Sequence, residues 1–79
     1  MDIHLKEMKA GETGEITGFN EGDPDYRRKL LSLGFTKGAK FRVIRVAPLG
    51  DPVEIEIRGF QLSLRKDEAN IIKVRRIAQ

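Results

Sequence analysis

The chain has 79 residues, of which 39% are hydrophobic, so it has room for one small domain, which we place at residues 1–79. It has no cysteine, which excludes disulfide bonds, thiolate metal sites and a cysteine nucleophile; its single histidine, His4, excludes a cluster of histidine ligands within one chain. With 15 Lys and Arg against 12 Asp and Glu, the net charge is +3, and both signs are interspersed as on an ordinary solvated surface rather than a dense nucleic-acid-binding stripe.

The sequence also bears on the compartment. No apolar run approaches the roughly 20 residues needed to cross a bilayer. The N-terminal residues MDIHL lack the basic stretch followed by an apolar stretch that marks an export signal. We therefore expect a cytoplasmic protein.

The first part of the chain is expected to form a helical turn and a strand. Residues 5–8 have the spacing of one helical turn, with apolar side chains three positions apart. Residues 15–19 have the composition of a strand, in which Gly18 introduces a bend.

A single substantial helix is predicted over residues 24–33. Asp23 suits its N-cap, because a carboxylate accepts bonds from first-turn amides, and Pro24 suits the first helical position. Gly34 suits the left-handed residue that ends a helix. The side chains expected on its buried face are Tyr26, Leu30 and Leu33.

Most of the second half is expected to form strands. Residues 39–47 form a strand whose apolar side chains change parity, which predicts a bulge near Val43 and Ile44. Residues 53–58 and 60–65 alternate cleanly around one glycine, as in a tight hairpin. The inward side chains of this hairpin are expected to be Val53, Ile55, Ile57, Phe60, Leu62 and Leu64.

A helical turn at residues 66–70 and a last strand at residues 71–77, with Ile72 and Val74 facing inward, complete the chain. An open flat sheet of this size would leave one apolar face in water, whereas a small barrel buries that face and reduces exposed edges. The sequence therefore predicts a mainly β fold, a small SH3-like β-barrel of about five strands with one inserted α-helix.

The residue types offer no clear catalytic or metal site. No Ser, Thr or Lys has an obvious base beside it, and no glycine-rich phosphate loop ends in Gly-Lys-Ser/Thr. No carboxylate spacing resembles a calcium loop, and Fe²⁺ usually requires imidazole together with carboxylate, whereas His4 is alone. We therefore predict no enzyme activity, no cofactor and no metal ligands.

Several stretches carry a resemblance to a known family. They are YRRKLLSLGFTKG at residues 26–38, RVAPLGDP at 45–52 and LSLR at 62–65, followed by Glu68-Ala69, Ile72 and Val74. In this order and spacing the chain resembles the FeoA family, small cytoplasmic proteins of bacterial ferrous iron uptake, over nearly its whole length. A similar module forms the C-terminal domain of DtxR-type metalloregulators. We expect no DNA-binding or metal-sensing domain before it here, which disfavours that version.

The resemblance implies an SH3-like barrel that acts by contact with FeoB, the membrane transporter with a cytosolic GTP-binding domain. The contact would modulate this G domain or the assembly of the transporter, and it would recruit the chain to the inner face of the plasma membrane. For the contact we single out a basic run and a leucine on the helix, together with a proline-stiffened loop. These residues are Arg27, Arg28, Leu31, Leu49, Gly50, Asp51 and Pro52.

Simpler interpretations and other classes stay open. The basic run fits an ordinary solvated helix face, Leu31 fits a wider buried stripe, and the loop fits a plain hairpin connection. A nucleic-acid-binding barrel would stack bases on exposed aromatics, but Tyr26 and Phe60 are assigned inward, which leaves too few. A metal-sensing module is the third class.

Overall fold

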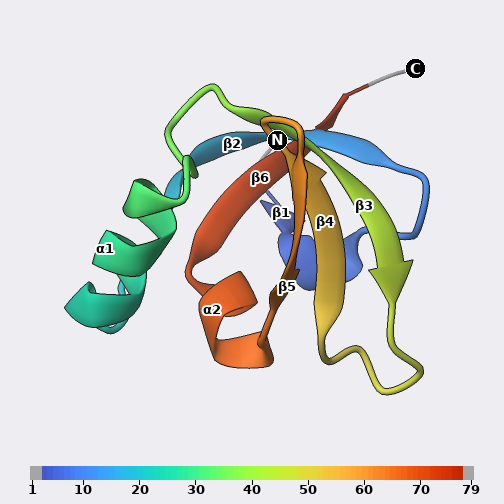
Figure 1. Cartoon of the computed structure of the whole chain (residues 1–79). Coiled ribbons are helices and arrows are strands. Elements are labelled where there is room, and N and C mark those ends of the chain that lie inside the picture. Colours follow the sequence, from blue (N-terminus) through green and yellow to red (C-terminus); the bar gives the residue numbers. More distant parts are fainter. Residues whose placement is uncertain (1–2, 78–79) are drawn as a thin grey trace.

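The chain folds into one curved antiparallel sheet with a helix standing to one side of it (Figure 1). The computed structural model describes residues 3–77, and the predicted domain 1–79 runs two residues further at each end. The elements in chain order are β1 (Ile3–His4), the 3₁₀ turn η1 (Leu5–Glu7), β2 (Thr13–Phe19), α1 (Pro24–Ser32), β3 (Lys40–Val46), β4 (Val53–Ile57), β5 (Phe60–Leu64), α2 (Lys66–Asn70) and β6 (Ile72–Ile77).

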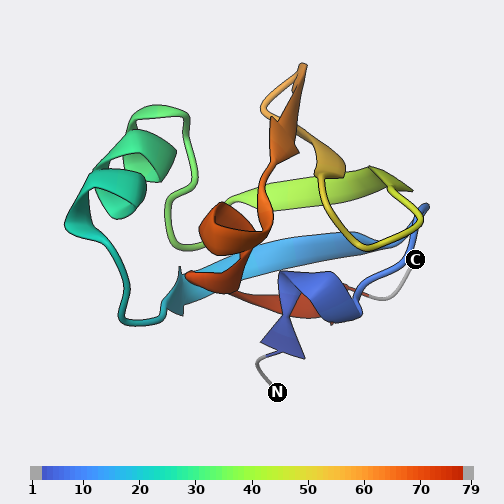
Figure 2. The same cartoon turned by 90° about the horizontal axis from the view of Figure 1, so that it is seen from below.

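The six strands pair in the order β1-β6-β2-β3-β4-β5. The sheet bends around its apolar face, and α2 joins β5 to β6 and packs against η1, α1 and β6 (Figures 1 and 2). No ladder joins β5 to β1 within residues 3–77, so the barrel is not closed by backbone hydrogen bonds between these two strands. The mainly β architecture with one long helix is as predicted, while β1, at two residues, was too short to give an alternation signal.

The core lies on the inner face of the sheet. Alternate residues of β4 and of parts of β3 and β6 belong to it, as the alternation predicts, together with residues of η1, α1, α2 and the connecting segments. The strand residues of the core are Ile16, Phe41, Val43, Val53, Ile55, Ile57, Leu64, Ile72 and Val74. The void left at the centre of this set is too small for a water molecule, so the interior is packed with side chains.

Two irregularities bend the sheet where the sequence indicates. The register of β3 against β4 shifts between Val43 and Arg45, at the predicted bulge. The register of β2 against β6 shifts between Ile16 and Gly18, at the predicted bend. Both shifts add curvature to the two longest strands of the sheet.

The ends of α1 follow the predicted chemistry. The Asp23 carboxylate accepts a hydrogen bond from the N–H of Asp25 at 2.8 Å, and Pro24 is the first helical residue. Gly34, with a φ of +98°, lies just beyond the end of the helix, where only a residue without Cβ adopts this conformation at low cost. The helix ends at Ser32, one residue before the predicted end.

Two inward assignments are wrong. The ring of Tyr26 is on the surface, because α1 stands away from the sheet and Leu30 is the one buried residue among the nine of this helix. Phe60 is 42% exposed. It lies opposite Ile57 with the predicted parity, but β5 is the end strand of the sheet and the core does not extend past it there. None of the helices in the described part of the chain is long and apolar enough to cross a bilayer.

Candidate docking surface

The outer side of α1 presents an apolar residue between two cations. Leu31 is 42% exposed, so it does not widen the buried stripe. Arg27 and Arg28 precede it by four and three residues, and these spacings place side chains on one side of a helix. The three predicted helix residues therefore share one solvent-facing side of α1.

The two arginines have different partners. Arg28 lies 3.4 Å from a carboxylate oxygen of Asp25, and both side chains are at least 80% exposed, so this pair is worth ~0.5 kcal/mol at most. The Arg27 guanidinium lies over the ring of Phe19, 5.5 Å from its centroid, in a cation–π contact. Arg28 can therefore turn to a new carboxylate at low cost, whereas Arg27 holds α1 near the end of β2.

The loop between β3 and β4 carries a leucine into solvent. Leu49 is 96% exposed. The loop is bonded to itself: Ala47 accepts from the N–H of Gly50 at 2.7 Å and donates its own N–H to the carbonyl of Pro52 at 3.2 Å. These two bonds hold the turn that carries Leu49, so the apolar tip is presented without a large loss of loop entropy on contact.

Asp51 has a structural partner inside the molecule. Its Oδ1 accepts a hydrogen bond from the backbone N–H of Lys66, the first residue of α2, at 3.1 Å. The first N–H groups of a helix have no partner within the helix, so a carboxylate there stabilises the end. Asp51 therefore ties the loop to α2, a role that the sequence did not indicate.

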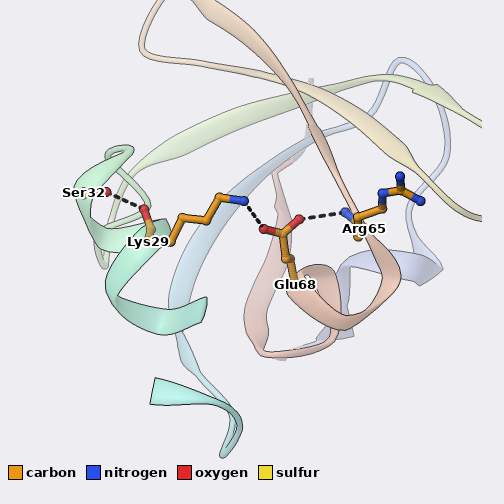
Figure 3. Close-up of polar contacts among 4 residues, drawn as sticks. All are labelled: Lys29, Ser32, Arg65 and Glu68. Atoms are coloured by element: carbon orange, nitrogen blue, oxygen red, sulfur yellow. Dashed lines mark hydrogen bonds and ion pairs between the residues drawn. The ribbon is translucent and has the colours of Figure 1, made fainter. Parts of the chain in front are cut away.

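The helix α1 is tied to the same short helix by an ion pair (Figure 3). Lys29 Nζ lies 2.7 Å from Glu68 Oε2, and the second oxygen of this carboxylate accepts from the N–H of Arg65 at 3.0 Å. The Glu68 side chain is only 8% exposed. Burial acts to raise the pKa of Glu68, but the bonds from Lys29 and Arg65 outweigh it, and the pKa lies below the ordinary value.

The two ties place α1, the loop and α2 around one groove of about 460 Å³. The groove is lined by Tyr26, Lys29, Asp51, Arg65, Lys66, Asp67 and Glu68. The structure thus brings Asp51 close to α1, but on the side of Tyr26 and Lys29. Arg27, Arg28, Leu31 and Leu49 do not line the groove, so the predicted docking residues form two exposed patches joined through α2.

The described carboxylates and His4 do not gather into a metal site. Within residues 3–77 no three His, Asp or Glu side chains lie close enough to hold an ion together. His4 is in β1, and its backbone N–H donates to Glu7 Oε2 at 2.7 Å, which caps η1.

Comparison with known proteins gives a family and a fused relative. The FeoA domain family matches residues 3–76. The Fe(2+) transport protein A/Fe(2+) transporter FeoB fusion protein of Porphyromonas gingivalis is 34% identical over 76 residues, which cover 96% of this chain and 9% of that protein. This chain therefore spans less than a tenth of that relative. The solution structure of the FeoA protein from Chlorobium tepidum is 43% identical, with a TM-score of 0.85 over 96% of this chain and 71% of the other.

Two solved structures of lower identity share the fold. Stenotrophomonas maltophilia FeoA complexed with zinc, described as a procaryotic SH3 domain protein, is 24% identical with a TM-score of 0.80 over 92% of this chain and 89% of the other. A manganese-dependent transcriptional repressor complexed with manganese is 22% identical, with a TM-score of 0.87 over 96% of this chain and 37% of the other. The SH3-like fold and its likeness to a repressor domain are thus both confirmed.

Proposed function

Because this chain belongs to the FeoA domain family, we propose that it is a non-enzymatic accessory of ferrous iron uptake that works by binding a FeoB-type transporter. The observation that carries the proposal is the P. gingivalis relative, in which a region similar to this chain shares one polypeptide with FeoB. Fusion holds two domains at a high local concentration, which favours a working contact between them. In this proposal the chain works at the inner face of the plasma membrane.

We assign docking to the two exposed patches joined through α2. Leu31 and Leu49 supply the apolar contacts, because exposed leucines gain most from burial against a partner. Arg28 supplies a charge for a carboxylate of the transporter, while Asp51 positions the loop through α2. The full set is Arg27, Arg28, Leu31, Leu49, Gly50, Asp51 and Pro52. The surface that receives it is the cytosolic G domain or the cytoplasmic face of the transporter.

Leu31→Asp and Leu49→Asp test the assignment in cells that lack their own copy of the chain. Both residues are exposed, so each variant should unfold within about 0.5 kcal/mol of wild type in urea. Each should nevertheless lower uptake of radioactive Fe²⁺ toward the level of the deletion, since a charge buried at an interface is costly. Lys37→Asp, a charge change on the exposed turn before β3, is the control and should keep normal uptake. Normal uptake in both leucine variants would remove this surface from the proposal.

The competing classes are tested on the purified chain. Because Tyr26 and Phe60 are exposed, a nucleic-acid column is a necessary control, and retention that falls steeply with salt would favour a nucleic-acid-binding barrel. Tight, stoichiometric binding of Fe²⁺ or Mn²⁺ in a titration would favour a metal-sensing module. We expect neither result.

A further inference from the structure

Strand β5 leaves an open edge on the sheet. It is the last strand in the sheet order, and it stands on the side of the sheet that faces α1 (Figure 2). Proteins protect such edges with charges, proline, a bulge or a very short strand. The β5 sequence FQLSL has no charge and no proline, and its pairing with β4 has no register shift. The other end strand, β1, has only two residues, which makes it a poor template.

The turn before β5 fixes which backbone groups bond to β4. Arg58 and Gly59 have φ values of +51° and +85°, as in a two-residue hairpin turn. In such a hairpin the residues on either side of the turn, Ile57 and Phe60, form a hydrogen-bonded pair.

Hydrogen-bonded and non-hydrogen-bonded pairs alternate along an antiparallel ladder. Leu62 and Leu64 therefore also bond to β4, opposite their partners there. The N–H and C=O groups of Gln61 and Ser63 point the other way, out of the sheet. Four backbone groups on one side of β5 are thus positioned to receive another strand.

The side chains next to this edge are apolar. Phe60 is 42% exposed and Leu62 is half-buried, and both project toward the inner face of the sheet. An added strand would place alternate side chains against them. The site therefore favours a segment with apolar residues at every second position.

A second copy of this chain is a poor occupant, because of the charges at the two ends of β5. Antiparallel self-pairing centred on Leu62 would bring the Arg58 end of β5 in each copy next to the Arg65 and Lys66 end of β5 in the other, and like charges close to each other oppose the pairing. Within residues 3–77, no carboxylate forms an ion pair with Arg58, Arg65 or Lys66. The Arg58 guanidinium donates to two neutral acceptors, the Gly34 carbonyl and the Thr36 hydroxyl, each at 3.1 Å, so its charge is not neutralised. Asp67 follows on α2, so the excess of positive charge is clearest at Arg58 and Arg65. Acidic ends on the added strand would suit these cations.

We propose that the free edge of β5 binds, by antiparallel β-addition, an extended partner segment with apolar residues at alternate positions and acidic residues at both ends. Its central apolar residue lies opposite Leu62, and its backbone bonds to Gln61 and Ser63. The identity of the partner rests on the proposed function: the segment belongs to the cytoplasmic part of the transporter.

Hydrogen exchange on the full chain tests the site directly. The probe is a nine-residue peptide, capped at both ends, with valine at three alternate central positions, threonine between them and two glutamates at each end. At saturation it should slow exchange of the Gln61 and Ser63 amides at least about tenfold, while the Leu62 amide, already in the ladder, changes little. No slowing at Gln61 and Ser63 would overturn the proposal.

Two altered peptides separate backbone pairing from simple adhesion. Methylation of the two peptide nitrogens that face β5 removes donors without changing the side chains, and it should weaken binding at least about tenfold. Lysine at both ends should weaken binding roughly tenfold at low salt. Equal binding of all three peptides would overturn β-addition. Protection of Gln61 and Ser63 in the free protein that disappears on dilution would instead assign the edge to a second copy.

Ser63→Pro carries the test into cells. The Ser63 N–H is not needed for the ladder with β4, so proline blocks only the outer edge, while Ser63→Ala keeps the N–H as the matched control. Ser63→Pro should abolish peptide binding and Fe²⁺ uptake, and Ser63→Ala should keep both. Normal uptake in Ser63→Pro beside lost uptake in Leu31→Asp would overturn the edge site and leave the proposed function standing. If the peptide binds but cells that lack the chain take up Fe²⁺ normally, the transporter is not the partner. If Ser63→Pro does not fold, binding of the methylated peptide to the wild-type chain tests the edge site instead.

Discussion

Glu68 is a buried carboxylate with two donors, the ammonium of Lys29 and the N–H of Arg65. Glu68→Gln keeps the shape and one acceptor oxygen but removes the charge that pairs with Lys29. We expect this change to lower the free energy of unfolding by about 1–2 kcal/mol in urea. Glu56→Gln, the same change at an exposed position of β4, should shift it by less than about 0.5 kcal/mol. Equal effects of the two substitutions would contradict a structural role for the ion pair.

The same carboxylate predicts a pH dependence. The pKa of Glu68 is lowered from 4.5 in the folded chain, so the stability that its charge contributes is complete above pH 4.5 and is lost as the pH falls through the folded-state pKa. The difference in unfolding free energy between wild type and Glu68→Gln should therefore be constant from about pH 7 to 5 and shrink below pH 4.5. The pKa of Glu12 is also lowered, first by the N–H of Lys9, but Glu12 is present in both proteins and cancels. A difference that persists unchanged to about pH 3 would exclude this carboxylate as its source.

Gly14 allows the close approach of β2 to an aromatic ring. A Cβ at this position would lie 2.6 Å from Cζ of Phe41 and 3.1 Å from the carbonyl oxygen of Arg75. We expect Gly14→Ala to lower stability by about 1–3 kcal/mol in thermal denaturation, because the ring must move within a packed core. Gly18 lies in the same strand with nothing within 4 Å of its added Cβ, so Gly18→Ala is the control and should change stability by no more than about 0.5 kcal/mol. A Gly14→Ala protein as stable as Gly18→Ala would show that the ring is free to shift.

At the scale of elements, the bond from Asp51 to α2 gives a prediction about the loop. Asp51→Ala removes the acceptor for the Lys66 N–H, and exchange of that amide should speed up by about five- to tenfold. Asp51→Asn keeps an acceptor oxygen at the same place, so it should leave exchange close to wild type. Identical exchange in wild type and Asp51→Ala would show that the loop is held by its own bonds alone.

The element boundaries could largely be predicted, whereas the depth at which each element lies could not. Asp23, Pro24 and Gly34 mark the ends of α1 through local chemistry, and local chemistry survives in any fold. The burial of Tyr26 and Phe60 depends instead on how far the core reaches beneath α1 and β5. The extent of the core is set by the whole sheet. The alternation therefore predicted correctly which face of β5 carries Phe60, but it did not predict that this side chain is exposed.

The candidate surface could be predicted only in part, for a similar reason. The exposure of Leu49 followed from two prolines and a glycine around it, and these residues exclude a central strand. The contact between Lys29 and Glu68 joins residues that are 39 positions apart, and in the sequence each reads as an ordinary charged surface residue. No periodicity in the sequence connects them. Only the structure shows that α2 receives both the ion pair from α1 and the bond from Asp51.

At the scale of the whole molecule, the fused relative suggests a rescue experiment. Joining the Leu31→Asp chain to its transporter by a flexible linker replaces a bimolecular encounter with an intramolecular one, at millimolar effective concentration. We therefore expect the linked variant to restore most of the Fe²⁺ uptake that the free variant loses. The linked wild-type chain is the control. A linked variant as defective as the free one would mean that Leu31 acts after docking.

The attachment of α1 has a consequence for how the molecule moves. Leu30 is its one buried residue, and the Lys29–Glu68 pair and the stacking of Arg27 on Phe19 add to its anchorage. Because these contacts are few, we expect α1 to open at a lower free energy than the strands, while every ladder of the sheet stays intact. We therefore expect a partner to meet the strands as a fixed frame and α1 in more than one position.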